Sequence, residues 1–120
     1  MSIRIVVSPL VRFKVEGKET AEDGSDVPFD FFLTAERLAT SEEVIALRQD
    51  VRDREIAGDK TPIVSALLPK VRDWAGPLAE DGKPAAFTQD NCRDLLNRPG
   101  MAALAFHAYI AAVGVKEKNS

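Results

Sequence analysis

Apolar and polar residues alternate along two stretches near the N-terminus, and this pattern limits the fold more than any other feature. In the first stretch, Val11, Phe13 and Val15 alternate with charged residues. In the second, at residues 27–33, one face holds Val27, Phe29, Phe31 and Leu33. A period of two is typical of a strand with one buried face. The polar residues 17–26 separate the two stretches, so we expect an antiparallel hairpin with a long loop.

Two details refine the expected hairpin. A further alternating run at residues 3–7 precedes a break at Pro9, because proline has no N–H to donate to a neighbouring strand. Phe31 and Phe32 are adjacent, so their side chains point to opposite faces of a strand. One of them faces away from the core unless helices cover both sides. The second face of the hairpin is therefore a candidate apolar patch.

The rest of the chain has the spacing of helices. Thr40 is a good N-cap for a helix from Ser41 to about Ile56, with Glu43 at the reciprocal position of a capping box. A second helix is expected to begin at Thr61-Pro62. Its apolar residues at helical spacing are Ile63, Leu67, Val71 and Trp74. Pro69 lies inside this pattern, so we expect a kink or a break there.

Two more helices are predicted near the C-terminus. Thr88 is expected to cap a third helix after a turn at residues 80–84, and Pro99-Gly100 separates it from a fourth. The fourth begins at Met101 and ends at Gly114. Its residues are mostly small, so another backbone can approach it closely.

These elements together predict an α+β fold, with an N-terminal antiparallel β-hairpin or small sheet followed by about four α-helices. We expect a single domain over residues 1–120, since the chain has the length of one domain. Residues 1–38 form its β-rich part, residues 39–115 its helical part, and residues 116–120 a flexible tail.

Composition excludes several classes of function. The chain has 16 basic and 19 acidic residues, and its net charge of −3 argues against non-specific binding to nucleic acid. The single cysteine allows no internal disulfide and suits a reducing cytosol. No stretch approaches the roughly 20 apolar residues of a membrane span, and the N-terminus lacks a secretory signal. We expect a cytoplasmic protein that binds neither nucleic acid nor membrane.

The sequence offers no catalytic motif. His107 is the only histidine, and a zinc site usually needs three or four ligands. Cys92 is interpreted as a small buried apolar residue. The carboxylates of residues 42–55 alternate with arginines, which is typical of a solvated helix face. Because glycine-rich phosphate loops and hydrolase motifs are missing, we predict a protein that is not an enzyme and binds no cofactor or metal.

Candidate binding residues are sought among the large side chains near the C-terminus. Trp74 and Tyr109 each combine an apolar body with a polar tip, and such residues serve either in the core or as anchors of an interface. We place a hypothetical groove between the last two helices and the segment around Trp74. Its predicted partner-binding residues are Trp74, Leu95, Leu96, Leu104 and Tyr109.

The chain resembles the small tail assembly chaperones of long-tailed bacteriophages and prophages. The resemblance covers most of residues 29–120 and rests on FDFFLTAERL, SEEVIALRQDVRDREI, VRDWAGPLAEDGKPAAFTQDNCRDLL and RPGMAALAFHAYIAAVGVKEKN. Its elements are a Trp-Gly-type segment at residues 74–76, an acidic-Gly-x-Pro turn at 81–84, a Phe-Thr helix start at 87–88 and a final helix with a Lys-Asn tail at 101–119. Residues 17–26 and Pro69 depart from the pattern.

The resemblance implies a binding role in the bacterial host cell. Such chaperones coat the tape-measure protein, keep it soluble and are displaced as the tail tube assembles. A longer frameshifted form of many members recruits the tail-tube protein. The alternative is a structural tail component, such as a completion or connector protein that forms oligomeric rings; a small-molecule-binding or enzymatic domain is a further alternative. Self-association into a homo-oligomer stays open.

Overall fold

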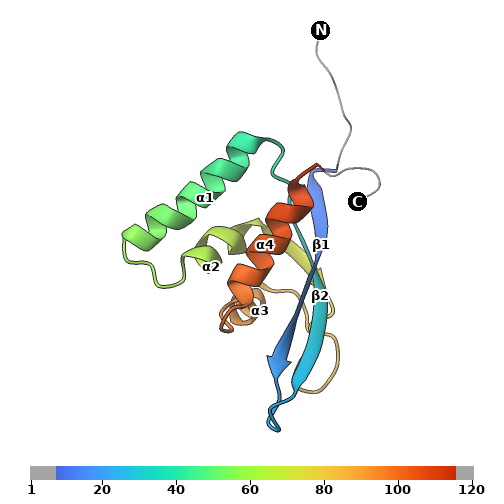
Figure 1. Ribbon diagram of the computed structural model, residues 1–120. Coiled ribbons are helices and arrows are strands. Elements are labelled where there is room, and N and C mark those ends of the chain that lie inside the picture. Colours follow the sequence, from blue (N-terminus) through green and yellow to red (C-terminus); the bar gives the residue numbers. More distant parts are fainter. Residues whose placement is uncertain (1–7, 116–120) are drawn as a thin grey trace.

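The computed structural model describes residues 8–115, so the strand predicted at residues 3–7 and the tail at 116–120 lie outside it. Within the described residues, a three-stranded antiparallel sheet combines with four α-helices, which confirms the α+β prediction (Figure 1). The strands are β1 (Leu10–Thr20), β2 (Asp26–Glu36) and β3 (Val71–Ala75). The helices are α1 (Ser41–Ile56), α2 (Pro62–Leu67), α3 (Gln89–Leu96) and α4 (Met101–Val113), and a short 3-10 helix (Leu68–Lys70) joins α2 to β3.

The sheet has the order β1-β2-β3, and the helices lie on one of its faces (Figure 1). Phe31 points into the core and is 5% exposed, whereas Phe32 lies on the open face, as their alternation predicted. The sequence predicted an apolar patch on that face, and this prediction is wrong. The guanidinium of Arg12 lies 4.3 Å from the centre of the Phe32 ring, and Lys14 pairs with Asp30 at 3.5 Å. The open face is therefore charged, and the Phe32 ring on it is covered by a cation.

The hairpin is longer and its turn shorter than the sequence predicted. The two strands pair continuously out to Thr20 and Asp26, so the connection is only residues 21–25. The N–H of Ala21 donates to the carbonyl of Ser25 at 2.7 Å, and the Asp23 carboxylate accepts from the Ser25 N–H at 2.9 Å. Figure 1 shows this end of the hairpin projecting past the helices. Both faces are exposed there, which explains why a paired strand carries the polar composition of a loop.

The predicted second helix is correct only in its first half. The break expected at Pro69 is present, but Val71 and Trp74 belong to a strand and not to a helix. Trp74 pairs with Leu33, and Val71 pairs with Ala35, so three steps along β3 match two steps along β2. A β-bulge of this kind places two residues three apart on the same face. The bulge therefore produced a spacing that imitates a helix.

Helix capping follows the sequence prediction closely. The Thr40 hydroxyl accepts from the N–H of Glu43 at 3.1 Å, and the Glu43 carboxylate accepts from the N–H of Ala39 at 2.5 Å. The Thr88 hydroxyl accepts from the N–H of Asn91 at 3.0 Å. Each such cap stabilises its helix by about 1 kcal/mol. Both helices consequently begin at the residues that the sequence indicated.

The core forms where α4 packs against the sheet. The Tyr109 ring stacks on Phe13 of β1 with ring centres 5.4 Å apart, and its hydroxyl donates to the backbone carbonyl of Glu36 at the end of β2. Tyr109 thus bridges α4 to two strands while remaining inaccessible to solvent. The largest fully buried side chains are Tyr109, Leu33, Leu67, Leu96, Val15, Val71 and Cys92.

Gly76 ends β3 at a point where a side chain would collide with β2. Its φ is +115°, and an added Cβ would lie 3.0 Å from Phe31 Cβ and 3.1 Å from Phe31 Cα. Gly82 has a φ of +81° but no such neighbour within 4 Å among the described residues.

Alanine at either position, Gly76 or Gly82, costs about 1–2 kcal/mol of backbone strain. Gly76→Ala should lose about 1–3 kcal/mol more, because the overlap involves backbone. Urea unfolding of both variants checks this, and equal losses would contradict it.

Tyr109 should make stability depend on pH in the alkaline range. Burial, with the nearby Glu36 and Glu43 carboxylates, raises the pKa of Tyr109 from 10.0 to about 12. The folded state therefore holds the phenol proton more tightly than the unfolded chain does. Its contribution to the free energy of unfolding is complete below pH 10 and is lost as the pH rises toward 12.

Absorbance titration measures this pKa directly, because the chain has a single tyrosine. Tyr109→Phe serves as the control: it should lose about 1–3 kcal/mol at neutral pH, since a buried carbonyl is left unpaired, and show no tyrosine-linked loss at high pH. A titration midpoint close to 10 in the folded protein would disprove the burial argument.

Candidate functional site

The structure separates the five residues predicted to bind a partner. Tyr109 and Leu96 are 0% and 1% exposed, so they belong to the core and cannot contact a partner while the domain is folded. Of the two roles considered for Tyr109, core residue or interface anchor, the structure shows the first. The reason is chemical: its hydroxyl finds the Glu36 carbonyl inside the protein and needs no partner outside.

The other three predicted residues are partly buried but do not form one groove. The Trp74 indole meets the Phe87 ring edge-on at 5.5 Å and donates its N–H to the Ala85 carbonyl at 2.9 Å. Leu104 lies beside Gly17 of β1, at the opposite edge of the sheet from β3. Leu95 packs against the core from α3. Within residues 8–115, these side chains therefore do not come together in one groove between α3, α4 and Trp74.

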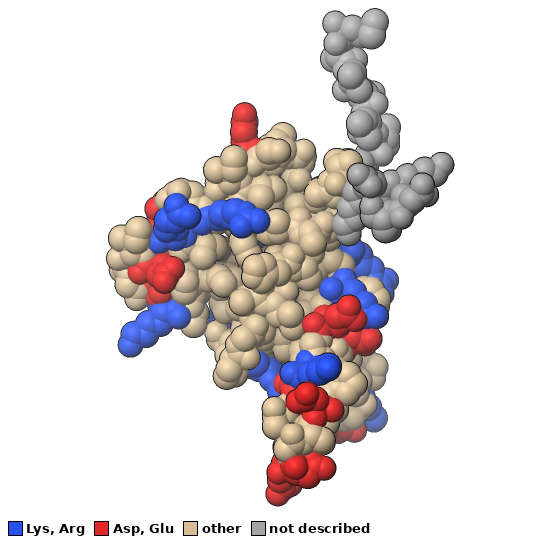
Figure 2. Space-filling view, in the orientation of Figure 1, with Lys and Arg blue, Asp and Glu red and all other residues tan. Residues whose placement is uncertain are grey.

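The outward side of α4 is the most unusual surface of the molecule. Its 13 residues include no Asp, Glu, Lys or Arg. Met101, Ala105 and Tyr109, spaced four apart, face the core. The opposite side, called here the α4 face, consists of the exposed Ala103, His107 and Ala111 with the partly buried Phe106 and Ile110. Figure 2 shows a broad uncharged area in this position, in front of the sheet.

A shallow groove borders the α4 face on the side of α1. Both α1 and α4 rest on α2, while they touch each other little. A cavity of about 360 Å³ lies between them, and Val44 and Ile45 of α1 line it with Ile110 and Val113 of α4. Residues 38–41 and 114–115 complete the lining, and we call this cavity the α1–α4 groove. Ile45 is 65% exposed, so its side chain is available for contact with another molecule.

A second hollow lies at the other end of α4. It measures about 310 Å³, and Pro62 and Ile63 of α2 line it together with Ala102 and Ala103 of α4, while Lys60 and Arg98 lie at its border. The α4 face therefore runs between two hollows that are partly lined by apolar residues. Since a helix rises about 1.5 Å per residue, this surface is about 20 Å long, which matches several turns of another helix.

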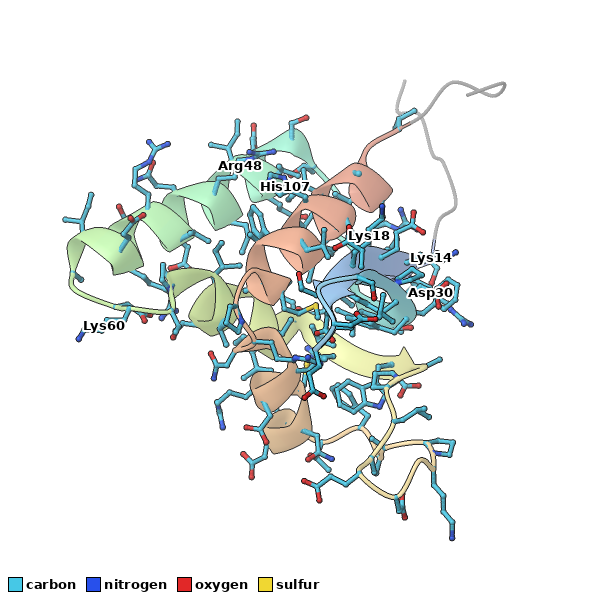
Figure 3. All side chains as sticks on the ribbon, turned by 60° about the horizontal axis from the view of Figure 1, so that its bottom comes forward. Lys14, Lys18, Asp30, Arg48, Lys60 and His107 are labelled. Atoms are coloured by element: carbon cyan, nitrogen blue, oxygen red, sulfur yellow. The ribbon has the colours of Figure 1, made fainter. Side chains whose placement is uncertain are left out.

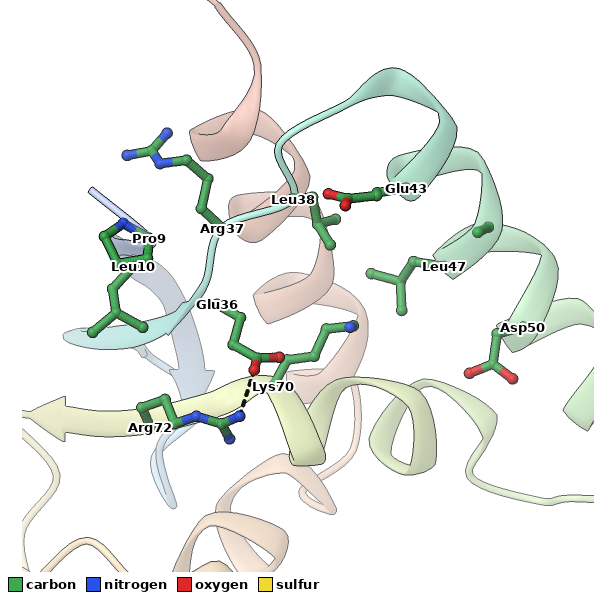
Figure 4. Close-up of a pocket in the computed structure, with 11 residues that line it drawn as sticks. Pro9, Leu10, Glu36, Arg37, Leu38, Glu43, Leu47, Asp50, Lys70 and Arg72 are labelled. Carbon is green, nitrogen blue, oxygen red and sulfur yellow. Dashed lines mark hydrogen bonds and ion pairs between the residues drawn. The ribbon is translucent and has the colours of Figure 1, made fainter. Parts of the chain in front are cut away.

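A larger pocket on the far side of α1 has a different character. It measures about 600 Å³, and charged residues of α1, β2 and β3 surround it (Figure 4). Glu36 pairs with Arg72 at 2.5 Å, and Asp50 pairs with Arg54 at 3.2 Å. Glu36 and Arg72 both line the pocket, whereas Arg54 does not, and the lining also includes Arg37, Glu43 and Lys70. The pocket is therefore of mixed charge, unlike the uncharged α4 face.

Reactive chemistry has little basis in the described residues. Burial raises the pKa of the Cys92 thiol to about 11, so the thiolate that a nucleophile requires is scarce at neutral pH. His107 makes no hydrogen bond within residues 8–115. That part of the chain also contains no cluster of three residues able to hold a metal ion. No helix in it has the length and apolar character needed to cross a bilayer.

Sequence reasoning missed most of the residues that form this surface. Ala103, Phe106, Ile110 and Ala111 were recognised only as parts of a helix with small residues. The signal that could have found them is the absence of charge from all of α4, because an ordinary surface helix has one charged side.

Comparisons with protein-family models, curated proteins and solved structures give no match to this chain. The remaining indications of function are the geometry of the α4 face and the resemblance in the sequence. Both concern the same segment, since the resemblance includes the residues of α4.

Cys92 provides a simple test of how tightly α3 closes over the core. Because the thiol is fully buried and its pKa is raised, it should react with a thiol reagent only when the domain opens. The measurement compares the rate of modification in buffer with the rate in denaturant. Equally fast modification in both would show that α3 does not protect the thiol.

Proposed function

We propose that this protein is a non-enzymatic tail assembly chaperone that binds an apolar helix of a tape-measure protein through the α4 face. The observation that supports this most is a solvent-facing helix without a single charged residue. Surfaces of this kind mark interaction sites, because isolated soluble domains rarely expose a continuous uncharged area.

The shape of the surface suits a helical partner. The α4 face offers small side chains at Ala103 and Ala111, and these allow the backbone of a bound helix to come close. The α1–α4 groove beside it can accept the larger apolar side chains of that helix. Binding of an amphipathic helix in an apolar groove is an established mode of recognition.

A chaperone must also release its target. Covering the apolar stripe of a long helical protein lowers the concentration of surface that aggregates, by mass action. A shallow surface gives modest affinity at each site, and many copies along one long target provide the total coverage. On this proposal, growth of the tail tube displaces the copies, and a longer frameshifted form recruits the tube protein. The protein would then act in the cytoplasm of the bacterial host.

The experiment is co-expression with a candidate tape-measure protein, a very long helical protein whose gene the proposal places next to the gene of this chain. Ala103→Glu and Ala111→Glu should each weaken its capture by about tenfold or more, because binding would bury an unpaired carboxylate. The soluble fraction of the target and a titration with a purified fragment both measure the effect. Glutamate is compatible with a helix, so the fold should survive.

Ala46→Glu is the matched control, since Ala46 is an exposed alanine of α1 on the side away from α4. It should leave capture unchanged. Equal effects of all three variants would contradict the proposed site. Mass measurement of the protein alone tests the alternative role: stable rings that the α4 variants dissolve would instead favour a structural tail component.

A further inference from the structure

The charges of α1 are sorted onto its two sides. Ser41, Val44 and Ile45 line the α1–α4 groove, whereas Glu43 and Asp50 line the pocket on the far side. Residues three and four apart share one side of a helix, so Arg48 and Arg52 lie on the same side of α1 as Ile45. The far side carries Glu43 and Asp50, of which Asp50 pairs with Arg54, whereas the side toward α4 is mainly basic.

Three basic residues border the uncharged area on this flank. Arg48, Arg52 and Lys60 are exposed, and none of them forms an ion pair within residues 8–115. Figure 3 labels Arg48 on α1, His107 on α4 and Lys60 at the connection between α1 and α2. Basic side chains also edge the tan area on its α1 side in Figure 2. Glu55, in the last turn of α1, is an acidic residue among them.

We propose that the helix bound at the α4 face carries acidic residues beside its apolar stripe, and that these lie against Arg48 and Arg52. This inference rests on the proposed function and adds the chemical class of the partner. The bound helix would place its apolar residues on the α4 face and in the α1–α4 groove. The carboxylates beside that stripe then lie against Arg48 and Arg52. The attraction between these charges fixes the orientation of the bound helix and speeds its association with the protein.

Two synthetic helical peptides test this directly. Both carry the same apolar stripe at positions i, i+3, i+4 and i+7, with glutamates beside the stripe in one and lysines in the other. Anisotropy of labelled peptide titrated with the whole protein gives each Kd. We expect the glutamate peptide to bind about tenfold tighter at low salt. High salt should reduce the difference, because exposed charges are screened.

The double variant Arg48→Glu/Arg52→Glu should abolish or reverse this preference. Arg54→Glu is the matched control, since Arg54 lies on α1 but pairs with Asp50 on the far side; it should keep the preference. Circular dichroism confirms that each variant remains folded. Equal affinity for both peptides, or a preference that survives the double variant, would overturn the inference.

The outcomes also separate this inference from the proposed function. If both peptides bind equally and Ala103→Glu abolishes their binding, the α4 face is the docking site but its partner needs no acidic flank. If neither peptide binds, and the tape-measure fragment is not captured either, both the inference and the proposed function are wrong.

Discussion

The structure depends on the contact between α4 and the hairpin, and Tyr109 is its centre. The sheet has one apolar face, and α4 is the helix that covers β1. Tyr109 stacks on Phe13 and donates a hydrogen bond to the Glu36 carbonyl, so one side chain ties the helix to two strands. Because α4 uses the side that carries Tyr109 for the core, its other side must face solvent. The position of the α4 face therefore follows from the packing of the core.

Much of the fold could be predicted from local signals. The hairpin follows from alternation, and Thr40 and Thr88 start α1 and α3 because a side-chain hydroxyl can cap a helix only at its first turn. The errors arose where tertiary pairing decides the structure. A β-bulge gave Val71 and Trp74 the spacing of a helix, and only the pairing with β2 reveals the strand. Residues 18–20 are polar because this end of the hairpin is exposed on both faces.

The candidate site was harder to predict than the fold. Large amphipathic side chains such as Trp74 and Tyr109 have the properties of interface anchors, but both form hydrogen bonds inside the protein. The surface is built instead from alanines and a few partly buried apolar residues, none of which stands out alone. The feature that distinguishes α4 is its lack of charged residues. The sequence alone does not reveal which side of α4 is exposed, because that depends on contacts between residues distant in sequence.

The pairing of an early strand with a late helix also affects how a nascent chain folds. β1 and β2 are synthesised before α4, so the apolar face that α4 covers stays uncovered until this last helix has been made. Two strands alone are marginally stable in water. Closure of the core consequently awaits a contact of very large sequence separation, which slows folding and lengthens the interval in which the chain can aggregate.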